Sequence, residues 1–428
     1  MAAIHCSSFV ALVLLGGLNT AAAAQGQGSQ PLGVELRLTE AVDQALLRNR
    51  DLLVKRREID IARGRLEQAR RYPFNPELNL QGDVGQGTGR VEPGDRRTGG
   101  GNVSLTQVVE VRGQRGLRIQ AAEADVAKSE WAARDGEREL RAATIRAFSD
   151  LLVAQERVEL ARQSLDLVTS FKSTAEELFR AGEVPEVDVL RAEVEVRRAV
   201  NRLAQDEAFL IGIMRALALL IGAAPDTKLR AQGPLLLDPI ADGREDLRAL
   251  ARSGRFDLRA VGAAADRARA TLRLVEAEQF LPSITLSAGY AETNDFDALN
   301  RRVVFGVSIP LPLWNRREGD VRAGAGDVSR QEAQYDQLAA QIDKEVLTAH
   351  QQFLTAQRVV EEYVRRIVPS QERAAEIVRE GYRLGQFRLT DALLSQRDLV
   401  DTRTGYLDAI AAYNAARVEL QKAVGLTQ

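Results

Sequence analysis

Residues 76–84 read Pro-Glu-Leu-Asn-Leu-Gln-Gly-Asp-Val, and residues 282–290 read Pro-Ser-Ile-Thr-Leu-Ser-Ala-Gly-Tyr. In both stretches apolar or small residues occupy every second position, which is the period of a strand with one apolar face. Shorter matches recur at nearly the same spacing: Asp51-Leu52 with Asp257-Leu258, Val103-Ser104-Leu105 with Val307-Ser308-Ile309, Gly182 with Gly385, and Gly222 with Gly425. The chain therefore holds two copies of one structural unit, each much longer than the roughly 20–50 residues of a solenoid repeat.

Each copy has a second strand that forms a β-hairpin with the first. We predict strands at about 76–85 and 102–110 in the first copy, and at about 282–291 and 302–313 in the second. A tilted strand of roughly 9–11 residues can cross a bilayer. Four strands cannot close a barrel, and an open sheet edge cannot face lipid. If these strands span a membrane, several chains must each donate four, and three chains would supply twelve.

Two heptad stripes follow the hairpins and predict very long helices. In each stripe the spacing alternates between four and three residues, as in a coiled coil. A helix from about Arg118 to Phe179 would be roughly 90 Å long. We interpret the stripes as packing surfaces, so only their length is diagnostic. They comprise Leu140, Thr144, Ala147, Leu151, Ala154, Val158, Ala161, Leu165 and Val168 in the first copy, and Ile342, Val346, Ala349, Phe353, Ala356, Val360, Tyr363 and Ile367 in the second.

A glycine is expected to reverse the chain at the end of each long helix. Gly182, followed by Pro185, and Gly385 are typical helix-ending residues. Return helices then complete two helical hairpins, at about 116–222 and 319–424. Each copy also opens with a predicted helix, the first beginning at an N-cap, Thr39. The expected organisation is a first repeat at 25–222, a linker at 223–242 and a second repeat at 243–428, with the two opening helices at about 39–71 and 244–279.

Residues 1–24 read as a secretory signal peptide, with a short apolar run and the sequence Ala22-Ala23-Ala24 before the expected cleavage point. Cleavage would remove Cys6, the only cysteine, so we predict neither a disulfide nor lipidation. The remaining chain has no apolar run long enough for a transmembrane helix. Its net charge of −2 argues against a nucleic-acid-binding protein.

No motif for catalysis, for a cofactor or for a bound metal is found in the sequence. The chain has two histidines, of which His350 is predicted to be a packing or surface residue. No zinc-ligand spacing, phosphate-binding loop or nucleophile elbow occurs. We therefore expect a protein that is not an enzyme.

Four aromatic residues lie where a predicted helix meets a predicted strand. Such junctions are where an interfacial aromatic girdle belongs if the strands cross a membrane. Packing at the junction is the alternative interpretation. The four are Tyr72, Phe74, Phe280 and Trp314.

This order of elements, together with the two tip sequences at 180–190 and 383–393, resembles the TolC-like outer membrane efflux protein family. The stretch Val111-Arg112-Gly113-Gln114-Arg115 is similar to the CzcC-like heavy-metal efflux branch. The resemblance implies a mainly α fold with a small β part. It implies a homotrimer with a twelve-stranded barrel in outer-membrane lipid and an α-helical barrel in the periplasm.

The resemblance also implies how such a protein works. The trimer would dock, tip first, onto a periplasmic adaptor and an inner-membrane transporter, here expected to be of the resistance-nodulation-division type. It would be a passive duct for substrates, expected to be heavy-metal cations. Drug efflux and type I protein secretion stay open, and a structural coiled-coil protein of the envelope is the alternative from another class.

The tips supply the candidate functional residues. Asp188 and Asp391 each follow a tip glycine by six positions, and in a closed tube they would form carboxylate rings that favour hydrated cations. The family implies that Tyr382 and Arg388 form polar links with Asp188 at this aperture. Residues at the start of a helix, interacting with its dipole, are the alternative interpretation.

Apolar residues beside the tip glycines are candidate contacts for the adaptor, because exposed apolar side chains at a tip indicate a partner surface. Packing within the hairpin is the alternative. We expect the asymmetry between the two tips to take part in closure. The candidate docking residues are Gly182, Val184, Leu190, Gly385, Phe387 and Leu393.

Overall fold

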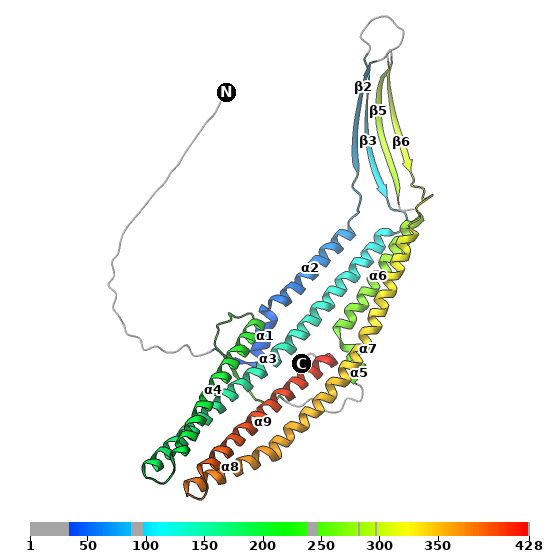
Figure 1. Ribbon diagram of the computed structural model, residues 1–428. Helices are drawn as coiled ribbons and strands as arrows, with labels where there is room; N and C mark the ends of the chain where they lie inside the picture. Colours follow the sequence, from blue (N-terminus) through cyan, green and yellow to red (C-terminus); the bar gives the residue numbers. More distant parts are fainter. Residues whose placement is uncertain (1–33, 87–96, 238–246, 281–282, 296–297, 427–428) are drawn as a thin grey trace, which may run out of the picture.

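The computed structural model describes residues 34–86, 97–237, 247–280, 283–295 and 298–426. The predicted signal peptide lies outside these residues. The protomer is a long rod with a narrow sheet at one end and helices over the rest of its length (Figure 1). None of the described helices is both long enough and apolar enough to cross a membrane.

Four antiparallel strands form the sheet: β2 (Glu77–Gln86), β3 (Arg97–Val109), β5 (Ile284–Asp295) and β6 (Ala298–Ser308). Their order is β2-β3-β5-β6, so the hairpins of the two copies lie side by side through β3 and β5. The prediction that the last strand reaches residue 313 is wrong, because β6 ends at Ser308. Pro310 and Pro312 follow it, and neither has an N–H for a strand ladder.

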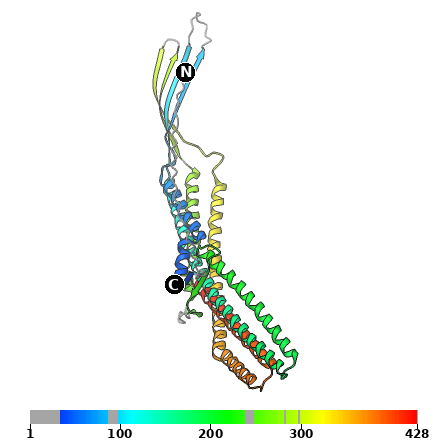
Figure 2. The ribbon, with the colours of Figure 1, turned by 90° about the vertical axis from the view of Figure 1, so that its left-hand side faces the viewer.

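Long helices run from the sheet to the tips, and shorter helices return from the tips along part of that length (Figure 2). In the first copy α3 (Gln114–Arg180) descends without a break and α4 (Glu186–Leu220) returns. In the second copy α7 (Glu318–Glu362), a π-helical turn (Tyr363–Ile367) and α8 (Val368–Arg383) descend, and α9 (Leu389–Val424) returns. The coiled-coil stripes predict both descents, whereas the π-turn was not expected.

The opening helix of each copy is broken, although the sequence predicted one continuous helix in each. The first copy has α1 (Leu38–Arg48) and α2 (Arg50–Arg70), and the second has α5 (Leu247–Gly254) and α6 (Phe256–Phe280). Thr39 is not the N-cap, because α1 begins one residue earlier, and Glu40 accepts a hydrogen bond from the Arg37 backbone.

The two breaks are equivalent joints made from different chemistry. The Asn49 side chain accepts from the Leu52 N–H at 3.0 Å, as a helix N-cap does, and donates to the Leu220 carbonyl at 3.1 Å. Arg255 donates to the Ala423 carbonyl at 3.4 Å and forms ion pairs with Asp257 and Glu345. Each joint therefore fastens an opening helix to the end of a return helix.

Side chains from the predicted stripes form part of the core, and residues of the opening and return helices pack against them. Leu140, Leu151 and Val158 are buried in α3, and Ile342, Val346 and Phe353 are buried in α7. Two separate main clusters form, one in each copy. Two smaller clusters join the copies: one at the tips packs Phe171 and Ala192 against Leu389, and one packs Val153 against Leu407 and Ile410.

The predicted linker also fastens the two copies together. Its strand β4 (Leu229–Gln232) pairs in parallel with β1 (Val34–Arg37). Gln155 of α3 donates to the Ala231 carbonyl at 3.1 Å and accepts from its N–H at 2.8 Å. Asn414 of α9 likewise donates to the Leu235 carbonyl at 2.7 Å and accepts from the Leu237 N–H at 3.1 Å. Residues 229–237 thus bind α3 of the first copy and α9 of the second.

Candidate functional site

The tip of each helical hairpin turns on a glycine in the left-handed conformation. Gly182 has φ of 78° and Gly385 has φ of 72°. Such φ values strain residues that carry a Cβ, so glycine suits both positions. Backbone hydrogen bonds close the turns, from Glu183 to Leu178 and from Gln386 to Gly381. The predicted tip positions are therefore confirmed as the sharp reversals.

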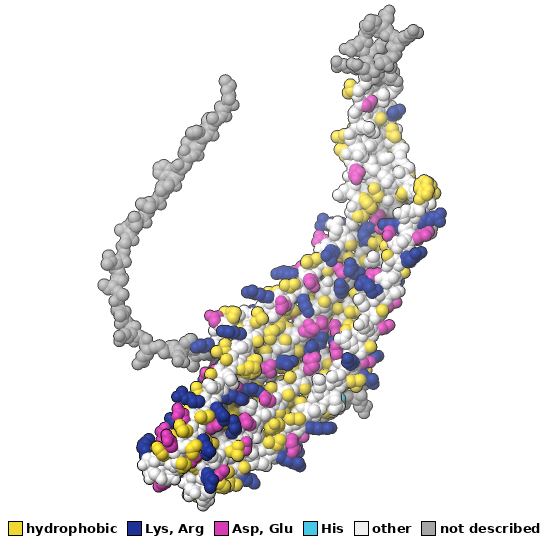
Figure 3. Space-filling view, in the orientation of Figure 1, with side chains coloured by type: hydrophobic (Ala, Val, Ile, Leu, Met, Phe, Trp, Pro, Cys, Tyr) yellow, Lys and Arg dark blue, Asp and Glu magenta, His cyan; other side chains and the backbone are white. Residues whose placement is uncertain are grey.

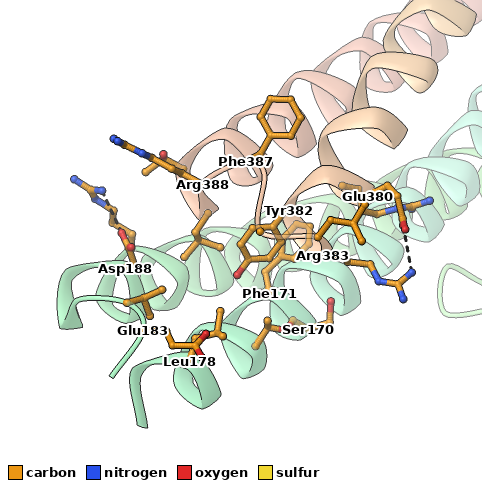
Figure 4. A pocket seen from close by; sticks show the side chains of 18 of the residues that line it. Ser170, Phe171, Leu178, Glu183, Asp188, Glu380, Tyr382, Arg383, Phe387 and Arg388 are labelled. Carbon is orange, nitrogen blue, oxygen red and sulfur yellow. Dashed lines mark hydrogen bonds and ion pairs between the residues drawn. The ribbon is translucent and has the colours of Figure 1, made fainter. Parts of the chain in front are cut away.

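A cavity of about 1140 Å³ lies between the two tips (Figure 4). Residues from α3, α4, α8 and α9 line it, including Phe171, Asp188, Tyr382 and Arg388. The structure thus brings three of the four predicted aperture residues to one space. Asp391, the fourth, is not part of this lining.

Tyr382 connects the two hairpins. Its ring meets Phe171 of α3 edge to face, with 5.7 Å between the ring centroids. In Figure 4 its hydroxyl points into the cavity, on the side of Asp188. Burial raises the pKa of Tyr382 above its usual 10.0, and the negative charge of Asp188 adds to the rise. The hydroxyl therefore stays protonated at neutral pH and is available as a donor.

The two aspartates differ in their surroundings. The Asp188 side chain is 19% exposed and forms an ion pair of 3.4 Å with Arg191, one turn further along α4. Asp391 is exposed and accepts a hydrogen bond from the Arg388 backbone N–H at 3.1 Å. Asp391 thus stabilises the start of α9, as the alternative interpretation proposed, whereas Asp188 faces the cavity.

The predicted docking residues fall in two places. Val184 and Phe387 line the cavity between the tips. Leu190 and Leu393 line a second groove of about 420 Å³ between α4 and α9, where Leu190 is exposed. Phe387 also covers Gly381, since a Cβ there would lie 2.2 Å from the ring. A larger residue at Gly381 would displace Phe387.

The sheet has one apolar face and one mainly polar face. Its register aligns Leu78, Leu105, Ala288 and Phe305 in one row across the strands, and Leu80, Val103, Tyr290 and Val303 in another. The leucines, valines and aromatic residues of these rows are exposed, Phe305 at 78%. A continuous apolar surface of this kind is rare on a protein that contacts only water.

Comparison with known proteins agrees with this geometry. The family model described as "Outer membrane efflux protein" matches residues 41–223 and 247–426, most of both copies. The chain belongs to this family. It is an outer-membrane protein whose helical part lies in the periplasm.

One relative and several solved structures align with nearly the whole chain. The cobalt-zinc-cadmium resistance protein CzcC of Cupriavidus metallidurans is 28% identical over 392 residues, which are 91% of this chain and 90% of that protein. The outer-membrane channel OprN superposes with a TM-score of 0.77 at 21% identity, over 91% of this chain and 89% of that chain. CusC superposes with a TM-score of 0.75 at 20% identity, over 94% of this chain and 95% of that chain. VceC of Vibrio cholerae superposes with a TM-score of 0.76 at 20% identity, over 91% of this chain and 96% of that chain. The fold of this efflux protein is therefore that of known outer-membrane channels.

The predicted girdle residues of this efflux protein are not equivalent to one another. Tyr72 and Phe74 meet edge to face at 6.2 Å, and the Tyr72 hydroxyl donates to the Val108 carbonyl at 2.9 Å and accepts from the Glu110 N–H at 3.0 Å. Tyr72 thus fastens the end of β3. Trp314 is 93% exposed. Phe280 ends α6, and its side chain lies outside the described part.

Sequence reasoning missed Phe171, the partner of Tyr382. Phe171 follows the last predicted stripe residue, Val168, by three positions, and Ala175 follows four later. Both are buried in the cluster at the tips. A longer helical window would have found them. Within the described ranges, no cluster of three or more His, Cys, Asp or Glu side chains is placed to hold a metal ion.

Proposed function

We propose that this protein is the outer-membrane duct of a tripartite efflux system and works as a homotrimer. The observation that carries the proposal is the open sheet, which exposes an apolar face and ends in edge strands β2 and β6. An open edge cannot persist in lipid, so β2 of one chain would pair with β6 of the next. Three sheets would close a barrel of twelve strands.

Oligomeric state in detergent tests this step. Purified protein is expected to run as a heat-modifiable trimer that needs detergent for extraction. Crosslinking of cysteines placed on the outer edges of β2 and β6 should join neighbouring chains, and no cysteine of the native sequence beyond Cys6 competes. A monomer that stays in water would contradict the trimeric duct and favour a structural envelope protein.

The tips would dock onto a periplasmic adaptor, which links the duct to an inner-membrane transporter of the resistance-nodulation-division type. Exposed Leu190 and Phe387 support an apolar contact there. The duct itself would be passive, with energy supplied by the transporter.

Heavy-metal cations are the substrate that we propose. The similarity to a cobalt-zinc-cadmium resistance protein supports this, together with the Asp188 carboxylate at the tip cavity. Three copies of Asp188 around one axis would attract hydrated cations. Deletion of the gene should lower resistance to zinc, cobalt or cadmium; a deletion strain that loses only drug resistance or protein secretion would overturn this substrate.

Single-channel recording tests the aperture. Asp188→Ala should lower the preference for cations and change the conductance. Asp391→Ala is the matched control, because Asp391 does not line the cavity. If both variants changed the conductance and the cation preference equally, Asp188 would not have the aperture role that we propose.

A further inference from the structure

The connector between β6 and α7, residues 309–317, is built unlike its counterpart in the first copy. It reads Ile-Pro-Leu-Pro-Leu-Trp-Asn-Arg-Arg. Its four large apolar side chains are all exposed: Ile309 at 48%, Leu311 at 70%, Leu313 at 61% and Trp314 at 93%. Burial of apolar side chains of this size is favourable, so a surface that leaves four neighbouring ones in water is unusual.

The first copy makes the same transition with residues 110–113. Glu110 is buried against Arg118 in a two-pronged ion pair, and the Tyr72 hydroxyl accepts from its N–H. The first connector is therefore held against the protein at Glu110, while Val111, which is 40% exposed, is its one large apolar residue at the surface. The second connector projects outward (Figure 1).

The projecting connector is nevertheless held in a defined shape. The Leu313 N–H donates to the Leu311 carbonyl at 2.9 Å, and the Arg317 N–H donates to the Asn315 side chain at 2.9 Å. The Arg317 guanidinium pairs with Glu278 of α6 and, at 3.3 Å, with Asp320 of α7. These contacts hold the connector in one conformation, with its apolar side chains exposed.

Along the connector the side chains change from apolar to aromatic to basic, which is the order expected from the membrane interior to its surface. Val303, Phe305 and Val307 lie on the apolar face of the sheet, and the apolar side chains of the connector continue the same alternation. Trp314 comes next, and exposed Arg316 follows. Apolar side chains favour the hydrocarbon of a membrane, tryptophan favours its interface, and arginine favours the lipid phosphates. Figure 3 shows hydrophobic side chains standing out where the sheet meets the helices, with basic side chains beside them.

We propose that residues 309–316 form a foot that inserts into the periplasmic phospholipid leaflet of the outer membrane. Ile309, Leu311 and Leu313 contact acyl chains, Trp314 lies at the interface, and Arg316 binds lipid phosphate. The proposal rests on the membrane orientation of the sheet in the proposed function. It goes further in assigning an anchor to this connector of the second copy.

Tryptophan fluorescence tests the foot directly, because the chain has two tryptophans. Trp131→Phe leaves Trp314 as the single tryptophan. The protein is reconstituted into vesicles of phosphatidylcholine with either plain or dibrominated acyl chains. We expect bromine to lower the Trp314 emission at least about twofold, since the indole lies at the acyl boundary.

Trp314→Phe is the matched control, because it leaves Trp131. That ring stacks on Phe256 at 5.8 Å, at the end of α6 away from the sheet, and Arg134 and Arg259 lie over it. The length of α6, roughly 37 Å, separates it from the sheet, so bromine should leave its emission unchanged.

Unquenched Trp314 would overturn the foot in either of two ways. Blue-shifted, unquenched emission would mean that a second copy of the chain covers Trp314. Red-shifted, unquenched emission would mean that it faces water. Trimer formation is read from the same samples on a gel. Quenching without a trimer would keep the foot and remove the trimeric duct, whereas an unquenched trimer would keep the duct and remove the foot.

Discussion

The two copies share their order of elements but differ in their long descending helix. In the first copy α3 runs for 67 residues, whereas the second divides the same descent into helices of 45 and 16 residues around a π-turn of 5. A π-turn holds one more residue than an α-helical turn, so the apolar stripe points in a different direction after it. Val360, before it, is 5% exposed, but Ile367, at its end, is 38% exposed. Duplication preserved the topology while local packing diverged.

The largest difference between the copies is expected at the joints. Arg255→Ala leaves Asp257 and Glu345 without their cation in a partly buried site and should cost about 3 kcal/mol. Asn49→Ala loses a helix cap and one hydrogen bond and should cost about 1–2 kcal/mol. Thermal melts of the purified variants compare the two. A larger shift for Asn49→Ala would show that the charged joint is not the stronger one.

The charged joint should also make the second copy sensitive to acid. Burial alone would raise the pKa of Asp257 and Glu345, but hydrogen bonds and the charge of Arg255 outweigh it and hold both below their usual 3.8 and 4.5. A carboxyl group whose pKa is lower in the folded than in the unfolded protein stabilises the fold at pH values above the unfolded pKa. This contribution is lost as the pH falls through the folded pKa. Asp135, whose pKa is raised by burial, acts in the opposite direction.

The protection factors of amides at the start of α6, which are corrected for the intrinsic pH dependence of exchange, should therefore fall below about pH 4, while those at the start of α2 change less. Asp257→Asn in the same experiment should reduce the acid response of α6. Equal acid responses at both joints in the native protein would contradict the assignment to Arg255.

Tyr363, the first residue of the π-turn, packs against a glycine in the facing helix α9. A Cβ at Gly405 would lie 2.6 Å from the Tyr363 hydroxyl oxygen, so Gly405→Ala must displace that ring and should cost about 1–3 kcal/mol. Gly212→Ala in α4 of the first copy is the matched control, because nothing lies within 4 Å of its Cβ position. It should be stabilising by about 0.5–1 kcal/mol through helix propensity. Similar melting shifts in both variants would exclude the packing explanation.

The smallest difference is expected between the tips. Asp391→Ala removes the carboxylate that caps α9 and should loosen its first turn by about 1 kcal/mol. Asp188→Ala loses a pair with a well-exposed arginine, worth at most about 0.5 kcal/mol. Amide exchange of the two helix starts measures both. Faster exchange in the Asp188 variant than in the Asp391 variant would reverse the comparison.

Periodicity predicted most of the fold because it is set by local burial. Leu140, Leu151 and Val158 follow the heptad and are buried as expected, and the strands lie where the sequence places them except that β6 ends at Ser308. The joints were missed because helical patterning continues through Asn49 and Arg255. The local signals, an N-cap asparagine and the helix-ending Gly254, were overlooked, and the contacts to Leu220 and Ala423 are tertiary. The candidate site was predicted less well. Gly182 and Gly385 follow from backbone conformation, but the separation of Asp188 from Asp391 depends on how two hairpins pack together.

The parallel pairing of β1 with β4 bears on the order in which the chain can be completed. A chain is synthesised from its amino end, so β1 remains an unpaired edge until Leu229 has followed the whole first copy. Gln155 can then secure Ala231 before the second copy has been made. The second copy closes last, because its joint at Arg255 needs the Ala423 carbonyl near the carboxyl end. A late truncation would therefore remove the Ala423 partner of Arg255 but leave the pairing of β1 with β4 possible.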